Sequence, residues 1–298
     1  MDHTQFLATL PSDVKADLTG RADAPGLARL AGHFGAIAIV GSLILWGVPF
    51  WPLLLPIQGI LIIFLFTLEH EATHKTPFRT EWINEWVGRV CGFLIILPFT
   101  WFRYFHLAHH RYTNIPDKDP ELLVGAKPET WPAFVWHVTG IPYWQSMIRK
   151  MVSNALGRNS DDYIPSSAAA RVRTEARWMI ASYAALLAVA VAGGVGLVWS
   201  WIFPLIISQP FLRIYLLAEH GRCPTVANMF ENTRTTFTNR MVRFLTWNMP
   251  YHIEHHAYPN VPFHKLPDLH NLAANHLVET ERGYIRFTGR YVAGFSAK

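Results

Sequence analysis

The chain has 298 residues, of which 51% are hydrophobic and only 16% are charged, and its formal net charge is +5. Soluble domains usually carry about 25% charged residues, so the composition argues against a soluble domain and favours a membrane protein. The two cysteines, Cys91 and Cys223, exclude a disulfide framework and an iron–sulfur cluster, which needs about four ligands.

Residues 1–30 are polar and contain no short apolar run, so we expect a cytoplasmic arm without a cleaved signal peptide. An apolar run without acidic or basic residues follows, and two prolines interrupt it. Spanning a bilayer takes about 20 mostly apolar residues, and proline cannot continue a helix interior. The run therefore predicts a first transmembrane hairpin over 31–71, with spans at 31–49 and 53–71.

The next segment, 72–176, is expected to be cytoplasmic or interfacial. Its apolar stretch 90–102 is short and contains Pro98. A full crossing there would separate His74 from His106, so we expect a re-entrant or interfacial helix instead. The stretch 128–156 mixes aromatic with basic residues, which is typical of a helix in the membrane interface and equally of an aromatic core in a cytoplasmic cap.

A second uncharged run predicts another hairpin over 177–220, with spans at 177–198 and 202–220. Residues 221–298 then form a second cytoplasmic segment. The turns of both hairpins contain no Lys or Arg, which places both termini in the cytoplasm by the positive-inside rule. The expected fold is therefore one all-α integral membrane domain over 1–298, with four transmembrane helices and a helical cytoplasmic cap holding a dimetal site.

Histidine is in excess, with fifteen in the chain, and nine of them fall into four short groups at predicted span ends or in the cytoplasmic segments. Residues at i, i+3 and i+4 share one face of a helix, so each group can direct its imidazoles to one point. The nine candidate metal ligands are His70, His74, His106, His109, His110, His220, His252, His255 and His256.

Nine imidazoles are too many for one ion, because even zinc takes about four ligands. Two ions with four or five nitrogens each fit the number, and imidazole suits zinc, copper, iron and nickel. A nitrogen-rich site with open positions favours oxygen chemistry. Metal-bound histidines usually donate their other N–H to a carboxylate or carbonyl. Candidates for that supporting role are Glu71, Glu219, Glu254 and Asn248, and also Glu69, Asp117 and Asp119.

The three boxes HEATH at 70–74, HLAHH at 106–110 and HIEHH at 252–256, with the added His220, resemble the membrane-bound fatty acid desaturase superfamily. The sequences around the second and third boxes look most like the bacterial branch of rhizobitoxine desaturase and the rhizopine-linked hydrocarbon oxygenase. The resemblance implies two iron ions, O2 as co-substrate and a location in the bacterial inner membrane. Because the cytochrome b5 motif His-Pro-Gly-Gly is missing, it also implies an external electron donor such as a ferredoxin, a rubredoxin or a cytochrome b5-like protein, with its reductase.

The resemblance implies desaturation of a fatty acyl or similar lipid-like chain, and hydroxylation on the same site is the alternative. Two more remote alternatives remain. HEATH also matches the HExxH signature of a zinc metalloprotease, which would leave seven histidines without a role. A metal transporter would place its ligands near the middle of the membrane, whereas these histidines lie at predicted span ends. Four aromatic residues are candidates for lining a substrate pocket: Trp46, Phe64, Phe66 and Phe211.

Overall fold

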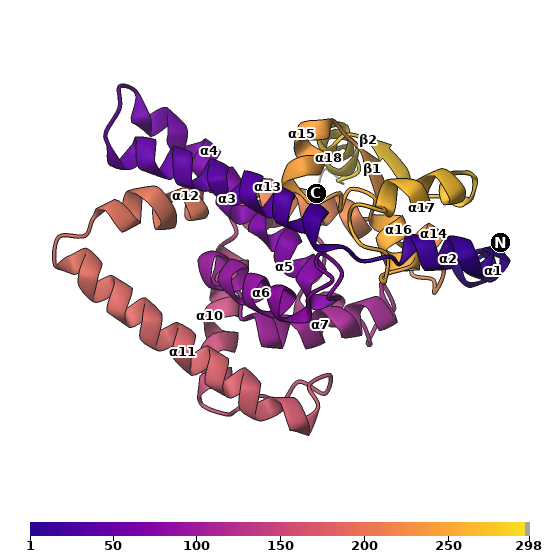
Figure 1. Ribbon diagram of the computed structural model, residues 1–298, viewed down its shortest axis with the longest axis horizontal. Coiled ribbons are helices and arrows are strands. Elements are labelled where there is room, and N and C mark those ends of the chain that lie inside the picture. The colour runs from indigo at the N-terminus through magenta and orange to yellow at the C-terminus, as the bar shows by residue number, and fades with distance from the viewer. Residues whose placement is uncertain (296–298) are drawn as a thin grey trace.

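The computed structural model describes residues 1–295, and helices make up most of it (Figure 1). The last three residues of the predicted domain lie outside the described residues. In chain order the elements are α1 His3–Thr9, α2 Ser12–Leu18, α3 Asp23–Leu45, a 3-10 helix Trp51–Leu53, α4 Leu54–Ile63, α5 Leu65–Thr73, α6 Glu81–Ile95, α7 Phe99–Tyr112, α8 Pro120–Val124, α9 Trp131–Val138, α10 Ile141–Ala155, α11 Ser166–Val191, a π-helix Val198–Ile202, α12 Phe203–Ile207, α13 Gln209–His220, α14 Met229–Asn232, β1 Thr235–Phe237, α15 Arg240–Leu245, α16 His252–Ala257, α17 Leu266–Ala273, a 3-10 helix Ala274–His276, β2 Thr280–Arg282 and α18 Tyr284–Ala293.

Three helical segments in residues 1–295 are long and apolar enough to cross a membrane, namely Ser12–Leu45, Trp51–Thr73 and Val198–His220. The first two form the predicted first hairpin, which Figure 1 shows as the long pair α3 and α4. The segments α6 and α7 together pass the same test, but they are bent by 100° relative to each other. The chain therefore offers three candidate spans, or up to four if the bent pair is one span.

The second predicted hairpin differs from the structure in its first half. The helix expected at 177–198 is α11, which begins eleven residues earlier and ends at Val191. It is not one of the three candidate spans, and its first turns carry Arg171, Arg173 and Arg177. The apolar signal of its second half was strong enough to predict a span, but the signal did not show where the helix begins.

The predicted interruption of the stretch 90–102 is present as a sharp corner between α6 and α7. Ile96 adopts a left-handed conformation with φ of 60° at the end of α6, and Pro98 precedes the first residue of α7. The corner turns α7 back so that it packs along α5 and α6. This brings the histidines of the second box against those of the first.

The cap is formed by α14 to α18 together with β1 and β2, which pair in parallel with Thr235 opposite Thr280. These two short strands correct the all-α prediction. The N-terminal arm packs on this cap: the rings of Phe6 and Phe230 lie 5.6 Å apart, and the backbone N–H of His3 donates to Oδ1 of Asn228. Figure 1 shows α1 and α2 beside α14 and α17 at the end of the molecule remote from both hairpin turns.

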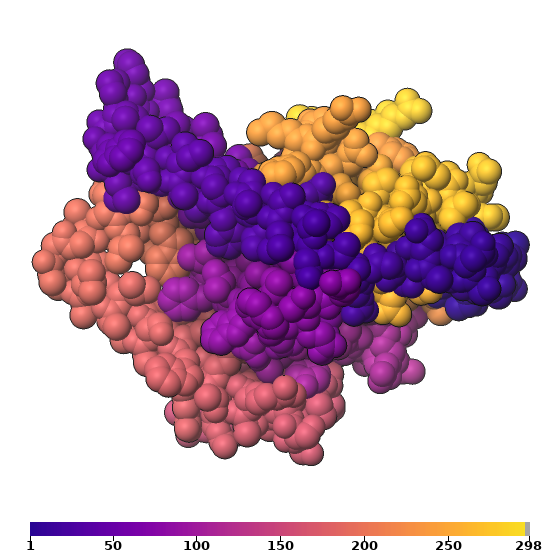
Figure 2. All heavy atoms as spheres, viewed as in Figure 1, coloured from indigo at the N-terminus to yellow at the C-terminus, as the bar shows by residue number. Residues whose placement is uncertain are grey.

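Large apolar side chains are exposed at the far ends of both hairpins. Trp46 is 78% exposed and Phe50 80% exposed at the first turn, and Val191 is 81% exposed at the second. Figure 2 shows this second hairpin, in salmon, standing away from the rest of the molecule with open gaps beside it. An exposed apolar surface of this size is typical of a site that contacts another protein or a membrane. The hydrocarbon core of a bilayer can cover such helices without further protein.

Candidate metal centre

The nine histidines come together from four helices whose ends meet at the cap. α5 carries the first box up to its end, α7 carries the second in its last two turns, α13 ends on His220, and the short helix α16 carries all of the third box. All nine rings are buried except those of His74 and His110, which are partly buried. Positions i, i+3 and i+4 share a face on each helix, so every group presents its rings to the same interior space.

Five of the rings form one group, which we call the five-histidine group. His70, His74, His106, His110 and His255 each place one ring nitrogen within 4.8 Å of those of the others. The closest pair of Nε2 atoms, on His74 and His106, is 2.9 Å apart. Only one member of this group comes from the third box.

The other four rings form the four-histidine group. His109, His220 and His256 meet the same 4.8 Å criterion. The Nε2 atom of His252 lies 3.2 Å from that of His220 and 3.1 Å from that of His256. The two groups adjoin, because the rings of His110 and His256 stack with centroids 4.0 Å apart.

These distances fit shared metal ions. Two nitrogens bound about 2.1 Å from one ion, at about 90–110° to each other, are separated by about 3.0–3.4 Å. The measured Nε2 separations of 2.9 to 3.3 Å match this range. Both ring nitrogens of His70 and of His110 are also buried without a hydrogen-bond partner among the described residues, and buried polar atoms normally have one. The donor set therefore suits two ions.

The electrostatics of the cap keep these rings in the form that binds metal. Burial, followed by the neighbouring imidazoles, lowers the pKa of His255 and His256 well below the usual value. Burial, followed by His109, does the same to the pKa of His252. A neutral imidazole has a free lone pair, so the three rings of α16 stay ready to bind metal at neutral pH.

Carboxylates lie behind three of the rings. The Nδ1 atom of His109 is 2.9 Å from Asp119, that of His252 is 3.4 Å from Glu219, and that of His255 is 3.4 Å from Glu71. The contact of Asp119 is a hydrogen bond, which fixes the ring orientation of His109 and makes its opposite nitrogen a better ligand. The Nδ1 atoms of His252 and His255 have no hydrogen-bond partner among the described residues. Glu71 and Glu219 therefore lie beside ligand rings without a hydrogen bond to them, and their supporting role stays a prediction.

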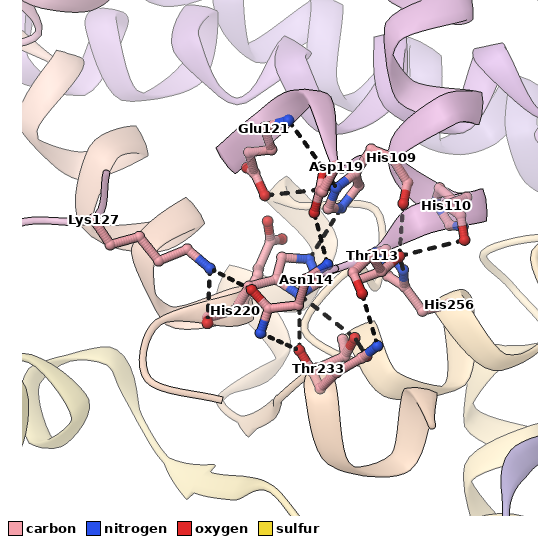
Figure 3. A network of polar contacts seen from close by, with 12 residues as sticks. His109, His110, Thr113, Asn114, Asp119, Glu121, Lys127, His220, Thr233 and His256 are labelled. Atoms are coloured by element: carbon pink, nitrogen blue, oxygen red, sulfur yellow. Dashed lines mark hydrogen bonds and ion pairs between the residues drawn. The ribbon is translucent and has the colours of Figure 1, made fainter. Parts of the chain in front are cut away.

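Two further contacts were not anticipated from the sequence. The Nδ1 atom of His220 lies 3.2 Å from the carbonyl oxygen of Asn232, and that of His256 lies 3.1 Å from the hydroxyl of Thr113. Figure 3 shows these contacts joined to that of Asp119 in one network behind the four-histidine group. A backbone carbonyl and a threonine have no distinctive sequence signal, whereas Asp119 is recognisable as the residue before the proline that starts α8.

Two predicted supporting residues contact other parts of the cap. Glu254 accepts a hydrogen bond from the hydroxyl of Thr235 and contacts the ring of His270, which is not one of the nine. The side chain of Asn248 donates to the carbonyl oxygen of Phe263, and it does not cap α16. Both residues hold the cap together, and neither one supports a ligand ring.

A cavity of about 560 Å³ opens beside the metal centre, and its size suits a lipid-like ligand. Its wall includes five of the nine histidines, His70, His106, His109, His220 and His252. Aromatic and aliphatic side chains form much of the remaining wall, among them Phe66, Leu97, Trp101, Phe102, Phe105, Tyr143 and Met147.

Of the four predicted pocket residues only Phe66 lines this cavity. Trp46 and Phe211 lie on the exposed surface, and Phe64 packs inside against Tyr215. Hydrophobicity alone did not separate a lining position from a lipid-facing or core position.

A comparison with known protein families covers the segment that carries these histidine groups. Residues 45–288 match the family described as fatty acid desaturase. The chain belongs to the fatty acid desaturase family. The match covers all nine histidines of the centre. Members of this family are oxidoreductases of lipid metabolism that use iron, and together with the apolar helices the membership indicates a membrane protein.

Relatives with assigned activities are similar in part of their length. A sn-1 oleoyl-lipid 12-desaturase of Picosynechococcus is 36% identical over 28% of this chain and 24% of its own length. A protein of the same name from Arthrospira platensis is 24% identical over 67% of this chain and 62% of its own. A sn-1 acyl-lipid omega-3 desaturase (ferredoxin) of Synechocystis is 21% identical over 81% of this chain and 74% of its own. The chain thus spans between a quarter and three quarters of these relatives.

Proposed function

We propose that this desaturase-family chain is an O2-dependent diiron oxidoreductase that desaturates a fatty acyl or similar lipid-like chain. The observation that carries the proposal is the convergence of nine buried histidines into two adjoining groups beside one mainly apolar cavity. Two iron ions bound in these groups would supply the activation of O2. With two electrons from an external donor and two protons, O2 would take two hydrogens from neighbouring carbons and leave an alkene and two molecules of water.

The residues of the chain have distinct parts in this proposal. The five-histidine and four-histidine groups would hold the two ions, and Asp119 would keep the ring of His109 oriented toward the metal. Glu219 and Glu71 lie 3.4 Å from the rings of His252 and His255, where they would support these ligands. The aromatic wall around Trp101 and Phe102 holds the apolar chain against the histidines and keeps water away. Orientation matters because the oxidised C–H bonds are unactivated and must be placed at the metals.

Hydroxylation of an alkyl or acyl chain is the second candidate, since the same ligands and cavity serve both reactions. The likeness of the second and third boxes to the rhizobitoxine and rhizopine-linked branch favours keeping it, because that branch contains both kinds of enzyme. The zinc protease and transporter alternatives are weaker. A single zinc needs about three protein ligands, whereas the HEATH histidines lie in a group of five.

We also propose a place and partners for the enzyme. The chain would lie in a bacterial inner membrane with the four spans predicted from the sequence, at 31–49, 53–71, 177–198 and 202–220. Both termini would then lie in the cytoplasm, and the metal centre would face the cytoplasm. Electrons would come from a separate ferredoxin, rubredoxin or cytochrome b5-like protein with its reductase. The omega-3 relative of Synechocystis carries ferredoxin in its name, which supports the first of these donors.

Expression in a bacterial host, followed by mass spectrometry of its lipids, tests the reaction. New double bonds support the proposal, and new hydroxyl groups establish the second candidate. Replacing His109 with Ala should abolish either product, while the control His276→Ala, outside both histidine groups, should keep it. About two irons per purified chain are expected. One zinc with proteolytic activity, or metal uptake into vesicles that is independent of O2, would overturn the proposal.

A further inference from the structure

A cation lies in the wall of the substrate cavity, on the same helix as a metal-facing histidine. Arg213 belongs to α13 and lines the cavity together with His220. The two residues are seven positions apart, which is about two turns, so they share a face of the helix about 10 Å apart along its axis. The guanidinium and the histidines of the metal centre therefore line the same cavity.

The guanidinium of Arg213 is incompletely satisfied within the protein. Its Nε atom donates to the side-chain oxygen of Gln209 at 3.1 Å, and its charge stacks over the ring of Tyr143 at 4.2 Å. Its Nη2 atom is buried and has no hydrogen-bond partner among the described residues. Arg103, which like Arg213 is partly buried, pairs with Glu85 at 2.6 Å, whereas Arg213 forms no ion pair with a carboxylate within residues 1–295.

A neutral polar side chain also lines the cavity. His137 lies on α9 and lines the cavity, and its buried Nε2 atom also lacks a hydrogen-bond partner in the part of the chain that the structure describes. Burial, followed by the charge of Arg213, lowers the pKa of His137 to about 4. The ring is therefore neutral at physiological pH, and its single N–H donates to the backbone of Arg213, so the free Nε2 atom is an acceptor.

Glu121 and Glu219 line the same cavity, but neither forms an ion pair with Arg213 among the described residues, so the buried Nη2 atom is left for a ligand. Uncompensated charge in an apolar site is costly, and the planar fork of a guanidinium matches a carboxylate with two parallel hydrogen bonds. A neutral ester carbonyl would accept one hydrogen bond and leave the charge unpaired. The geometry thus favours an anionic head group that enters the cavity rather than one that stays at the membrane surface.

We infer that Arg213 binds the carboxylate of the substrate, so that this enzyme acts on free long-chain carboxylic acids rather than on chains esterified in membrane lipids. The inference rests on the proposed function, because it names the substrate class of that same cavity. Arg213 is then a residue that sets specificity.

Binding is measured calorimetrically with the purified, iron-loaded enzyme in detergent, using palmitate and methyl palmitate as probes. The wild type is compared with Arg213→Gln, with Arg213→Lys and with the control Arg149→Gln, which removes an exposed arginine on α10 outside the cavity. A charge-assisted pair of this kind accounts for about 10-fold to 100-fold in affinity.

We expect the wild type to bind palmitate at least tenfold more tightly than its methyl ester. In Arg213→Gln only the affinity for palmitate should fall by that factor, Arg213→Lys should restore part of it, and the control should not change. Equal binding of acid and ester by the wild type overturns the inference without any variant, as does an equal loss of both in Arg213→Gln. New double bonds found only in esterified lipids would refute the inference and leave the proposed reaction intact. Selective binding of the acid without any oxidised product would refute only the proposed reaction.

Discussion

Replacing Asp119 with Asn tests whether the carboxylates behind the histidine rings hold the metal centre together. Asp119 is 1% exposed. Its Oδ1 atom accepts from the Nδ1 of His109 and from the backbone N–H of Glu121, both at 2.9 Å, and its Oδ2 atom accepts from the backbone N–H of Asn114 at 2.7 Å. Burial raises the pKa of Asp119, but the hydrogen bonds from His109 and from these backbone groups outweigh it and hold the pKa below the ordinary value.

Asparagine has one acceptor oxygen where aspartate has two. If the amide keeps its oxygen on His109, its NH2 group faces the N–H of Asn114, and one buried donor is left unpaired at a cost of about 1–3 kcal/mol. The neutral amide also makes the His109 ring a poorer ligand. Loss of such a supporting contact typically lowers metal affinity by about 10-fold to 100-fold.

We expect Asp119→Asn to lose the ion of the four-histidine group and to keep that of the five-histidine group. The measurement is the iron content of the purified protein during titration with a chelator. Asp117→Asn is the matched control, because Asp117 is exposed two residues away. Two irons retained at wild-type affinity in Asp119→Asn would refute the assignment of this carboxylate.

Three further predictions concern the ligands, the cavity and the packing of the hairpins. His255→Ala and His256→Ala should each retain about one iron, because they belong to different groups, and the double variant should retain none; two irons in either single variant would contradict the grouping. Ser146→Phe puts a large ring into the cavity wall, so turnover of the longest chains should fall about tenfold or more at unchanged iron content; unchanged turnover would argue against this cavity. A Cβ at Gly59 would lie 2.0 Å from an atom of the facing helix, so Gly59→Ala should lower stability by about 1–3 kcal/mol in a thermal melt, whereas Gly35→Ala, which has no contact within 4 Å, should not.

Local spacing explains how much of the metal centre could be predicted. The nine histidines were identifiable because each box lies within one or two turns of a single helix, where sequence distance fixes the face. The division of the nine histidines into a group of five and a group of four could not be predicted, because the third box contributes His255 to one group and His252 and His256 to the other. That division depends on how α16 is rotated against α7, which is a property of tertiary packing.

The supporting residues show the same limit. Glu254 lies between two ligands in sequence but contacts His270 on α17, whereas Asp119, ten residues from the ligand it supports, lies 2.9 Å from His109. On a helix, the residue directly before a ligand points away from the ligand face, so adjacency was a poor guide. The membrane segments were predicted from apolar runs, but the start of α11 was not, because polar first turns continue the same helix.

The placement of α16 has a consequence for how the protein is made. Each of the two histidine groups includes at least one ring from this helix, near the end of the chain. Translation proceeds at about 5–20 residues per second from the N-terminus, so neither group is complete until synthesis has passed residue 256. In the proposed enzyme, the nascent chain would therefore lack a complete ligand set for either ion until α16 has been made, and both ions would be loaded at nearly the same moment.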